Sequence, residues 1–293
     1  MTIKKWLKQN THDLSGKTVA ITGSTGGLGK ETCLHLAGLN ANLLFLNRNA
    51  EKSELLKTEI LKKYPNTKID FIKVDMQNFD SIKTACDILK SRKIDILILN
   101  AGAFNLKREK TVDGFDNVFQ INFLTPYFIT KTLLPCLNKN SKVVVVGSIA
   151  HRYTKINKND IQLMGESDAQ KIYGNSKRFL MFSLYELFKS QQNSSLSIVH
   201  PGITLTGITS NYPKHLLPII KLSMKIIYMP AKKACLSLIK GIFDHTEPFT
   251  WIGPKKKDIW GFPTKQSLKD YDIKEAKDAF EIAEKLYEEI DKQ

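Results

Sequence analysis

Short apolar runs alternate along this chain with stretches of amphipathic helical periodicity, such as 50–64 and 79–89, and this alternation restricts the fold more than any other feature. Strands that are apolar on both faces and are joined by helices form a parallel sheet covered on both sides. We therefore predict an α/β fold with a doubly wound parallel sheet, whose ligands bind at the carboxyl ends of the strands. The predicted strands are Thr18–Ile21, Asn42–Leu46, Lys68–Val74, Ile94–Leu99, Lys142–Val146 and Leu196–Val199.

The chain has no Pro-rich or Gly-rich linker and no internal repeat, so we predict one domain over residues 1–293. Its length and its 42% hydrophobic content allow a substantial core. Within this domain we interpret 204–229 as a lid over the substrate and 273–290 as a C-terminal surface helix.

Basic residues outnumber acidic ones by 44 to 29, which gives a net charge of +15. Such a surface attracts anions, including phosphorylated cofactors, nucleic acid and acidic lipids. The basic residues are spread along the chain without zinc spacing or an aromatic RNA-binding signature, so we expect no nucleic-acid partner and no metal site. The four cysteines, Cys33, Cys86, Cys136 and Cys235, lie far apart, which favours a reducing, cytoplasmic location.

Residues 1–14 carry lysines but no apolar segment long enough for a signal peptide. The most apolar later stretch, 216–229, is shorter than a bilayer span and contains Lys221 and Lys225. A peripheral membrane contact through these lysines is one interpretation, but a lid over an apolar substrate is favoured. The sequence leaves the oligomeric state open.

A glycine-rich turn follows the first predicted strand and leads into a helix predicted from Lys30. Gly23, Gly27 and Gly29 let the backbone turn sharply and approach a pyrophosphate, whose charge would meet the free N–H groups at the helix start. An ordinary glycine turn is the simpler alternative. The strand before the turn and the helix after it favour a dinucleotide site.

The second predicted strand ends in Leu46-Asn47-Arg48, with no acid to accept hydrogen bonds from the ribose hydroxyls of NAD. The Arg48 guanidinium can hold a phosphate at two points, so we predict NADP (as NADPH), with NAD as the alternative. Arg48 could otherwise be a solvated surface cation. Asp75, just after the third strand, could accept from the adenine amino group or cap the next helix.

Tyr173 and Lys177 are four residues apart and share one face of a predicted helix. A phenol loses its proton roughly three units above neutrality, and an adjacent ammonium makes it a usable acid or base. Such a pair often arises by chance, so its surroundings matter. Ser148 ends the fifth predicted strand, where its hydroxyl can donate to a developing oxyanion.

Two further motifs lie near the same sheet edge. The fourth predicted strand ends in Asn100-Ala101-Gly102, and the helix beyond it contains Asn122. Asparagine is unfavourable inside a helix, which suits a role other than helix formation.

In this order the motifs resemble those of the short-chain dehydrogenase/reductase family, from Gly16 to about Pro263. The resemblance implies a Rossmann fold and hydride transfer between a nicotinamide cofactor and a carbonyl or alcohol carbon. It looks closest to the retinol-dehydrogenase-like and WW-domain-oxidoreductase-like branch. The matching residues are Thr22-Gly23 with Gly27 and Gly29, Asn100-Ala101-Gly102, Asn122, Ser148, Tyr173 with Lys177, and Pro201-Gly202, and the branch is indicated by Asn47-Arg48, 147–151 and Ile252-Gly253-Pro254.

The resemblance also implies roles for single residues. Tyr173 would act as acid or base, while Lys177 would hold the nicotinamide ribose and tune Tyr173. Ser148 would orient the carbonyl, and Asn122 would support a water relay. We expect His151 to be structural or to contact substrate. The predicted cofactor-binding residues are Gly23, Ser24, Gly27, Leu28, Gly29, Arg48, Asp75, Asn100, Ala101, Gly102, Lys177, Pro201, Gly202 and Thr204.

We therefore predict an NADP(H)-preferring oxidoreductase that acts on a small carbonyl or alcohol substrate of apolar character. The alternative from another class is a catalytically weak NADP-binding redox sensor or regulatory protein. Loss of a catalytic residue would favour that alternative, and the motifs above retain all four catalytic positions.

Overall fold

The structure, a computed structural model, describes residues 1–203, 228–244 and 250–292. Within these ranges the strands form one eight-stranded sheet in the order β3-β2-β1-β4-β5-β6-β7-β8, parallel except for the antiparallel pairing of β8 with β7. The predicted doubly wound sheet is confirmed. The strands are β1 (Thr18–Thr22), β2 (Asn42–Asn47), β3 (Ile69–Lys73), β4 (Ile96–Leu99), β5 (Ser141–Val146), β6 (Ser194–Val199), β7 (Thr250–Lys256) and β8 (Trp260–Ser267).

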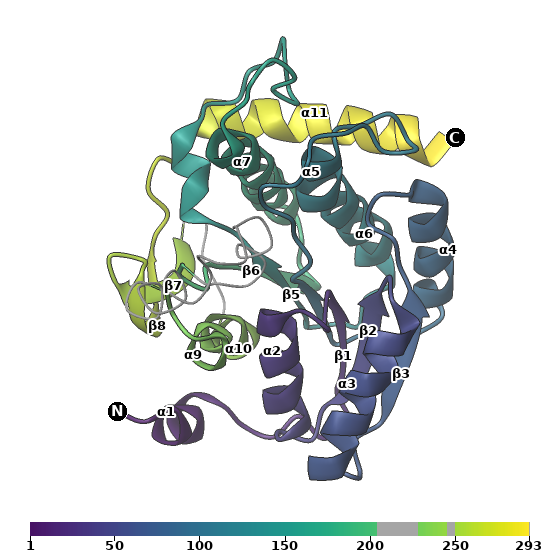
Figure 1. Cartoon of the computed structure of the whole chain (residues 1–293), viewed down its shortest axis with the longest axis vertical. Helices are drawn as coiled ribbons and strands as arrows, with labels where there is room; N and C mark the ends of the chain where they lie inside the picture. The colour runs from purple at the N-terminus through teal and green to yellow at the C-terminus, as the bar shows by residue number, and fades with distance from the viewer. Residues whose placement is uncertain (204–227, 245–249, 293) are drawn as a thin grey trace, which may run out of the picture.

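Helices cover both faces of the sheet (Figure 1). The helical segments are α1 (Ile3–Asn10), α2 (Gly27–Ala37), α3 (Ala50–Lys63), α4 (Phe79–Lys90), α5 (Asn117–Phe119), η1 (Gln120–Leu124), α6 (Thr125–Leu133), η2 (Leu134–Cys136), η3 (Ile149–Tyr153), α7 (Ala169–Phe188), α9 (Ala231–Ala234), α10 (Leu236–Phe243) and α11 (Ile273–Lys292). No helix in the described part of the chain is long and apolar enough to cross a bilayer.

Residue alternation within the central strands builds two cores. In β5, Val143 and Val145 pack with α4, α6, α7 and α11, whereas Val144 and Val146 pack on the opposite face with α2 and α10. Successive side chains of a strand point to opposite faces, so a strand covered on both sides must be apolar throughout. This is why β1, β2, β4, β5 and β6 are visible in the sequence as continuous apolar runs, whereas β3, at the edge of the sheet, exposes Asp70 and Lys73.

The two strands β7 and β8 were not predicted. Each interrupts its apolar pattern with lysine, proline or glycine, as in Gly253-Pro254-Lys255, because the hairpin lies at the sheet edge and is only partly covered. The predicted lid over 204–229 lies outside the described residues except for Tyr228 and Met229.

A buried ion pair joins α11 to α7. Arg178 of α7 is fully buried and donates from Nε and Nη2 to the two carboxylate oxygens of Glu275 at 2.6 and 2.5 Å. The same guanidinium donates to the backbone carbonyls of His151 and Asp270. One side chain beside Lys177 therefore holds together the η3 turn, α7 and the start of α11.

Replacing Glu275 with Gln should leave a buried guanidinium without its counter-charge and lower the free energy of unfolding by about 3–5 kcal/mol. Urea unfolding measures this loss. Glu289→Gln on the same helix is the control, because its pair with Lys285 is exposed on both sides and should contribute little to stability. Equal losses in the two variants would contradict a special role for Arg178.

Candidate active site

The glycine-rich turn lies at the carboxyl end of β1, next to β4, where the strand order reverses direction. Ligands of open parallel sheets bind at this switch point. Gly23 has φ +66°, and a Cβ at Gly29 would lie 2.3 Å from the Gly23 carbonyl oxygen, so the turn requires glycine at both places. The helix begins at Gly27 rather than at the predicted Lys30, because the turn itself supplies the first helical residues, which lack an apolar pattern.

Two asparagines hold this turn in place. Asn100 donates from Nδ2 to the carbonyl oxygens of Thr22 and Gly23, both at 3.0 Å. Asn47 accepts from the Ser24 backbone N–H at 2.9 Å and donates to the Ser24 hydroxyl at 2.7 Å. Sequence reasoning missed this role of Asn47. The one available signal was an amide at the end of a buried strand, where a polar side chain needs partners.

Arg48 follows β2 at the same sheet edge. It is exposed and forms no salt bridge with any other residue in the described ranges. The nearby Lys30 instead pairs with Glu59 at 2.6 Å. Among the described residues, Arg48 is thus an unneutralised guanidinium next to the glycine-rich turn.

Asp75 is half-buried after β3 and accepts from the Gln77 backbone N–H at 3.1 Å. It does not cap the next helix, because Asn78 is the N-cap of α4 and accepts from the Ser81 N–H. The alternative interpretation of Asp75 as that cap is therefore wrong. Its place at the carboxyl edge of the sheet leaves adenine recognition as a prediction.

Tyr173, Lys177 and Ser148 come together from two elements. Lys177 of α7 is buried, and its Nζ donates to the Val146 carbonyl oxygen at 2.9 Å and lies 5.8 Å from the centre of the Tyr173 ring. Ser148 follows β5, and its hydroxyl lies near enough to the Tyr173 phenol to lower the pKa of that phenol. Gly174 makes this approach possible, since a Cβ there would lie 2.2 Å from the Ala150 carbonyl oxygen.

Burial shifts both titrating groups of the pair. It raises the pKa of Tyr173 to about 12, opposed by the hydrogen bond from Ser148, and lowers the pKa of Lys177 to about 8. In each residue the charged form is the one that burial disfavours. Near neutral pH the site therefore presents a neutral phenol beside an ammonium.

Asn122 sits in the π-helical segment η1 and is fully buried. Its Oδ1 accepts from the Ala103 N–H at 2.9 Å, and its Nδ2 donates to the Ala103 carbonyl at 2.8 Å. The side chain thereby fixes the backbone just after Gly102. Short π-helical segments are frequent at functional sites, and the helical periodicity of the sequence gave no sign of this one. The water-relay role of Asn122 stays a prediction.

The Asn100-Ala101-Gly102 segment lies between the glycine-rich turn and the pair of Tyr173 and Lys177. The Ala101 N–H donates to the Thr22 hydroxyl at 3.0 Å. A Cβ at Gly102 would lie 3.0 Å from Asn122 Oδ1 and 3.5 Å from Lys177 Nζ, so this position links the two halves of the site.

The remaining predicted residues divide between the helix start and the end of β6. Leu28 is buried in the first turn of α2. Pro201 and Gly202 are buried after β6, and Gly202 has φ +83°. Thr204 lies outside the described residues. His151 is buried between the carbonyls of Ser148, at 2.6 Å, and Lys269, at 3.0 Å, so it fastens the η3 turn to the segment before α11.

Lys177→Met should stabilise the cofactor-free protein at pH 7, because it removes a buried ammonium that costs roughly 2–3 kcal/mol. Between pH about 8 and pH about 10 the folded wild type releases this proton before the unfolded chain does. Wild-type stability then rises with pH, and the difference between the two proteins should narrow.

Urea unfolding at pH 7 and at pH about 10 measures the difference in stability between wild type and Lys177→Met. Lys171→Met, on the exposed face of the same helix, is the control. A Met variant that is less stable than wild type, or a difference that does not change with pH, would contradict the account.

Comparison with known proteins agrees with this geometry. Residues 17–216 match the family described as short chain dehydrogenase. An uncharacterized oxidoreductase of Schizosaccharomyces pombe is 31% identical over 255 residues, which cover 80% of this chain and 74% of that protein. Mouse retinol dehydrogenase 12 is 34% identical over 204 residues, which cover 68% of this chain and 65% of that protein.

Solved structures share the fold. A protein from Mycobacterium paratuberculosis superposes with a TM-score of 0.77 at 23% identity, covering 96% of both chains. An NADPH-dependent 3-quinuclidinone reductase from Rhodotorula rubra gives a TM-score of 0.60 at 17% identity, covering 79% of this chain and 85% of that one. The ordered motifs, the sheet and the relatives lead to one conclusion: this chain belongs to the short-chain dehydrogenase/reductase family of oxidoreductases, on its retinol-dehydrogenase-like branch.

Proposed function

We propose that this protein is an NADP(H)-preferring oxidoreductase that interconverts an apolar carbonyl compound and its alcohol. The observation that carries the proposal is the meeting of Tyr173, Lys177 and Ser148 at the carboxyl edge of the sheet, beside the glycine-rich turn. An acid, a cation and a hydroxyl donor at one place are the groups that carbonyl reduction needs.

The residues present fit a nicotinamide dinucleotide. Helix α2 starts after Gly26 with no side-chain cap, so its first N–H groups can bind a pyrophosphate. Gly102 leaves room between the glycine-rich turn and Lys177, which would hold the nicotinamide ribose. When bound, the cofactor supplies or accepts the hydride.

The chain's own residues handle the proton and the oxygen. In the reducing direction Tyr173 gives its phenolic proton to the substrate oxygen, and the Ser148 hydroxyl donates a hydrogen bond to the same oxygen. The Ser148 hydroxyl is oriented because it accepts from the Ala150 N–H at 3.2 Å. The Lys177 ammonium stabilises the phenolate that forms, and solvent then restores the proton.

Arg48 supports the preference for NADP. It stands at the end of β2 without a salt bridge to the described residues, where the 2′-phosphate of NADP would lie. The Rhodotorula reductase, which shares the fold, is described as NADPH-dependent.

The apolar substrate is supported by Phe104, whose ring packs edge-on against Tyr173 at 5.3 Å between ring centres. Relatives bear the names retinol dehydrogenase 12 and polyprenol dehydrogenase. We also propose a reducing, cytoplasmic location, supported by the free cysteines, of which Cys33, Cys86 and Cys235 are buried.

Tyr173→Phe removes only the proton donor, so turnover with a panel of aldehydes, ketones and retinoids should fall by roughly 10² to 10⁴. Absorbance of NADPH follows turnover, and fluorescence titration should show unchanged cofactor binding. Tyr153→Phe, on the exposed end of η3, is the control. A wild type that binds NADPH but reduces no compound would favour the regulatory alternative, and a Phe variant with normal turnover would exclude Tyr173 as the acid.

Arg48→Ala should weaken NADPH binding about ten- to a hundredfold and leave NADH nearly unchanged, because a charge-assisted phosphate contact contributes roughly 1.5–3 kcal/mol. Dissociation constants of both cofactors measure the effect. Arg92→Ala is the matched control, since Arg92 pairs with Asp70 away from the glycine-rich turn. Equal losses for both cofactors, or a wild type that prefers NADH, would overturn the assignment.

A further inference from the structure

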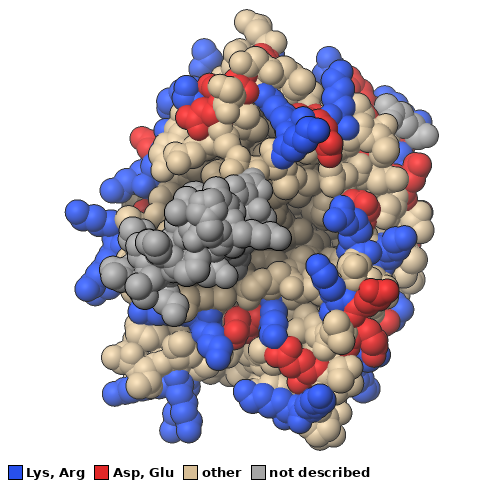
Figure 2. All heavy atoms as spheres, in the orientation of Figure 1, with Lys and Arg blue, Asp and Glu red and all other residues tan. Residues whose placement is uncertain are grey.

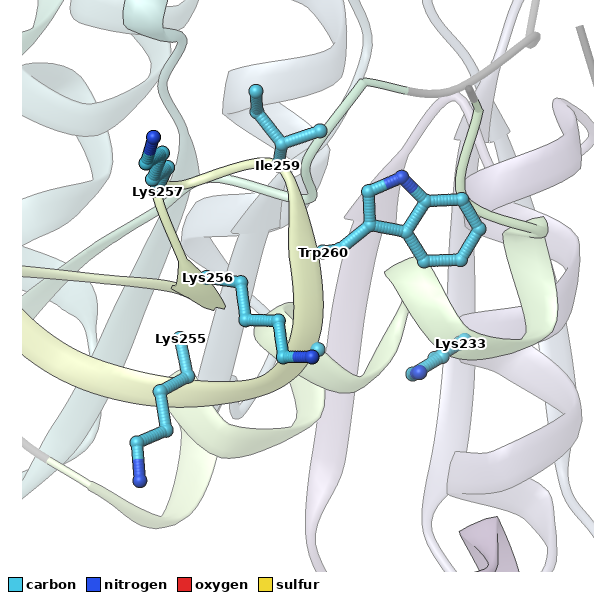
Figure 3. Close-up of a pocket in the computed structure, with 7 residues that line it drawn as sticks. Lys233, Lys255, Lys256, Lys257, Ile259 and Trp260 are labelled. Atoms are coloured by element: carbon cyan, nitrogen blue, oxygen red, sulfur yellow. The ribbon is translucent and has the colours of Figure 1, made fainter. Parts of the chain in front are cut away.

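Lysines gather around the hairpin of β7 and β8. An open groove of about 870 Å³ is lined by Ile259, Trp260 and Gly261 together with lysines from two elements. Figure 3 shows the lysine side chains spread around the Trp260 ring. We call this region the basic hairpin surface and define it by Lys233, Lys255, Lys256, Lys257, Ile259 and Trp260.

The turn of the hairpin keeps its positive charge unneutralised. Lys255, Lys256 and Lys257 are all exposed, and Lys257 and Asp258 have φ of +52° and +61°, so the chain reverses sharply after them. The Asp258 carboxylate is turned inward, where it is 7% exposed and bonds to Arg152 at 3.2 Å. The acid in this turn is therefore withdrawn from the surface.

Helix α1 extends the same surface. Trp6 of α1 stacks on Phe262 of β8 at 6.1 Å, and the Lys233 ammonium lies 5.1 Å from the Phe262 ring. Lys4 and Lys8 are exposed on α1. Figure 2 shows basic side chains along the left margin of the molecule, where Figure 1 places β7, β8 and α1.

Within the described ranges, none of the lysines of the basic hairpin surface and none of those on α1 forms a salt bridge. Unpaired lysines beside a tryptophan and an isoleucine are the combination that binds the interface of an anionic bilayer, because the cations meet the headgroups while the apolar side chains enter the interfacial layer.

We infer that the basic hairpin surface docks this protein on anionic phospholipid bilayers. Nucleic acid is the less suitable anion, since the lysines surround an apolar groove floor rather than a polar one. β7 runs parallel to β6, so the turn that follows β7 lies at the carboxyl edge of the sheet. This turn packs against Gly202, where a Cβ would lie 2.8 Å from the Ile259 carbonyl oxygen.

This placement has a functional consequence, which rests on the proposed function. The docked protein would hold the carboxyl edge of its sheet close to the bilayer, and Ser148 and Tyr173 lie at that edge. An apolar alcohol or ketone partitions into the bilayer, so it would reach the site from there.

Co-sedimentation of the full chain with vesicles tests the surface without any substrate. Binding should be strong to phosphatidylcholine vesicles containing phosphatidylserine and weak to phosphatidylcholine alone. Lys255→Gln, Lys256→Gln and Lys257→Gln together should weaken partitioning about a hundredfold. The matched control changes three exposed lysines of α11, Lys274, Lys277 and Lys285, to Gln, and should change partitioning by about threefold or less.

Fluorescence quenching by brominated phospholipids adds a second readout. Trp6 and Trp251 are buried, so quenching should come from Trp260 and disappear in Trp260→Phe. Equal losses in the two triple variants would show attraction by net charge alone and overturn the proposal. A protein that binds a short oligonucleotide but does not bind the vesicles would also overturn the proposal. Carbonyl turnover is not used here, so the docking proposal and the proposed function can fail separately.

Discussion

The bond from the buried Lys177 ammonium to the Val146 carbonyl determines the geometry of the site. It ties the centre of α7 to the carboxyl end of β5, and Tyr173, one helical turn earlier, is thereby placed beside Ser148. Burial that lowers the pKa of Lys177 also puts its charge in a low-dielectric setting, where it acts strongly on the phenol. The same burial that makes Lys177 costly for stability therefore strengthens the effect of its charge on Tyr173.

The protein offsets this penalty with interactions behind the site. Arg178, the next residue on α7, is held by Glu275 and by two backbone carbonyls, and His151 fastens the η3 turn between two further carbonyls. The bonds of the Arg178 guanidinium lie in a buried setting, so they fix α7 against η3. On the cofactor side, Asn100 and Asn47 hold the glycine-rich turn in the same way. In both halves of the site, hydrogen bonds from neighbouring side chains hold the polar groups in fixed positions.

The sequence predicted what depends on local pattern and on spacing along the chain. Apolar runs revealed the first six strands, β1 to β6, and the order of the motifs indicated which residues meet at the sheet edge. It could not reveal contacts made between distant residues with no pattern of their own, such as Arg178 with Glu275, 97 positions apart. The π-helical form of 120–124 and the edge hairpin around Lys256 were missed for a related reason, because packing rather than periodicity decides them.

Transfer of deuterium tests the central claim most directly. NADPH carrying deuterium in place of both hydrogens at C4 would be incubated with the protein and an apolar ketone, and the alcohol product analysed by mass spectrometry. We expect one deuterium at the former carbonyl carbon in the product of the wild-type protein, and roughly 10² to 10⁴ times less product from the Tyr173→Phe variant over the same time. An alcohol without deuterium, or labelled product formed equally by both proteins, would contradict it.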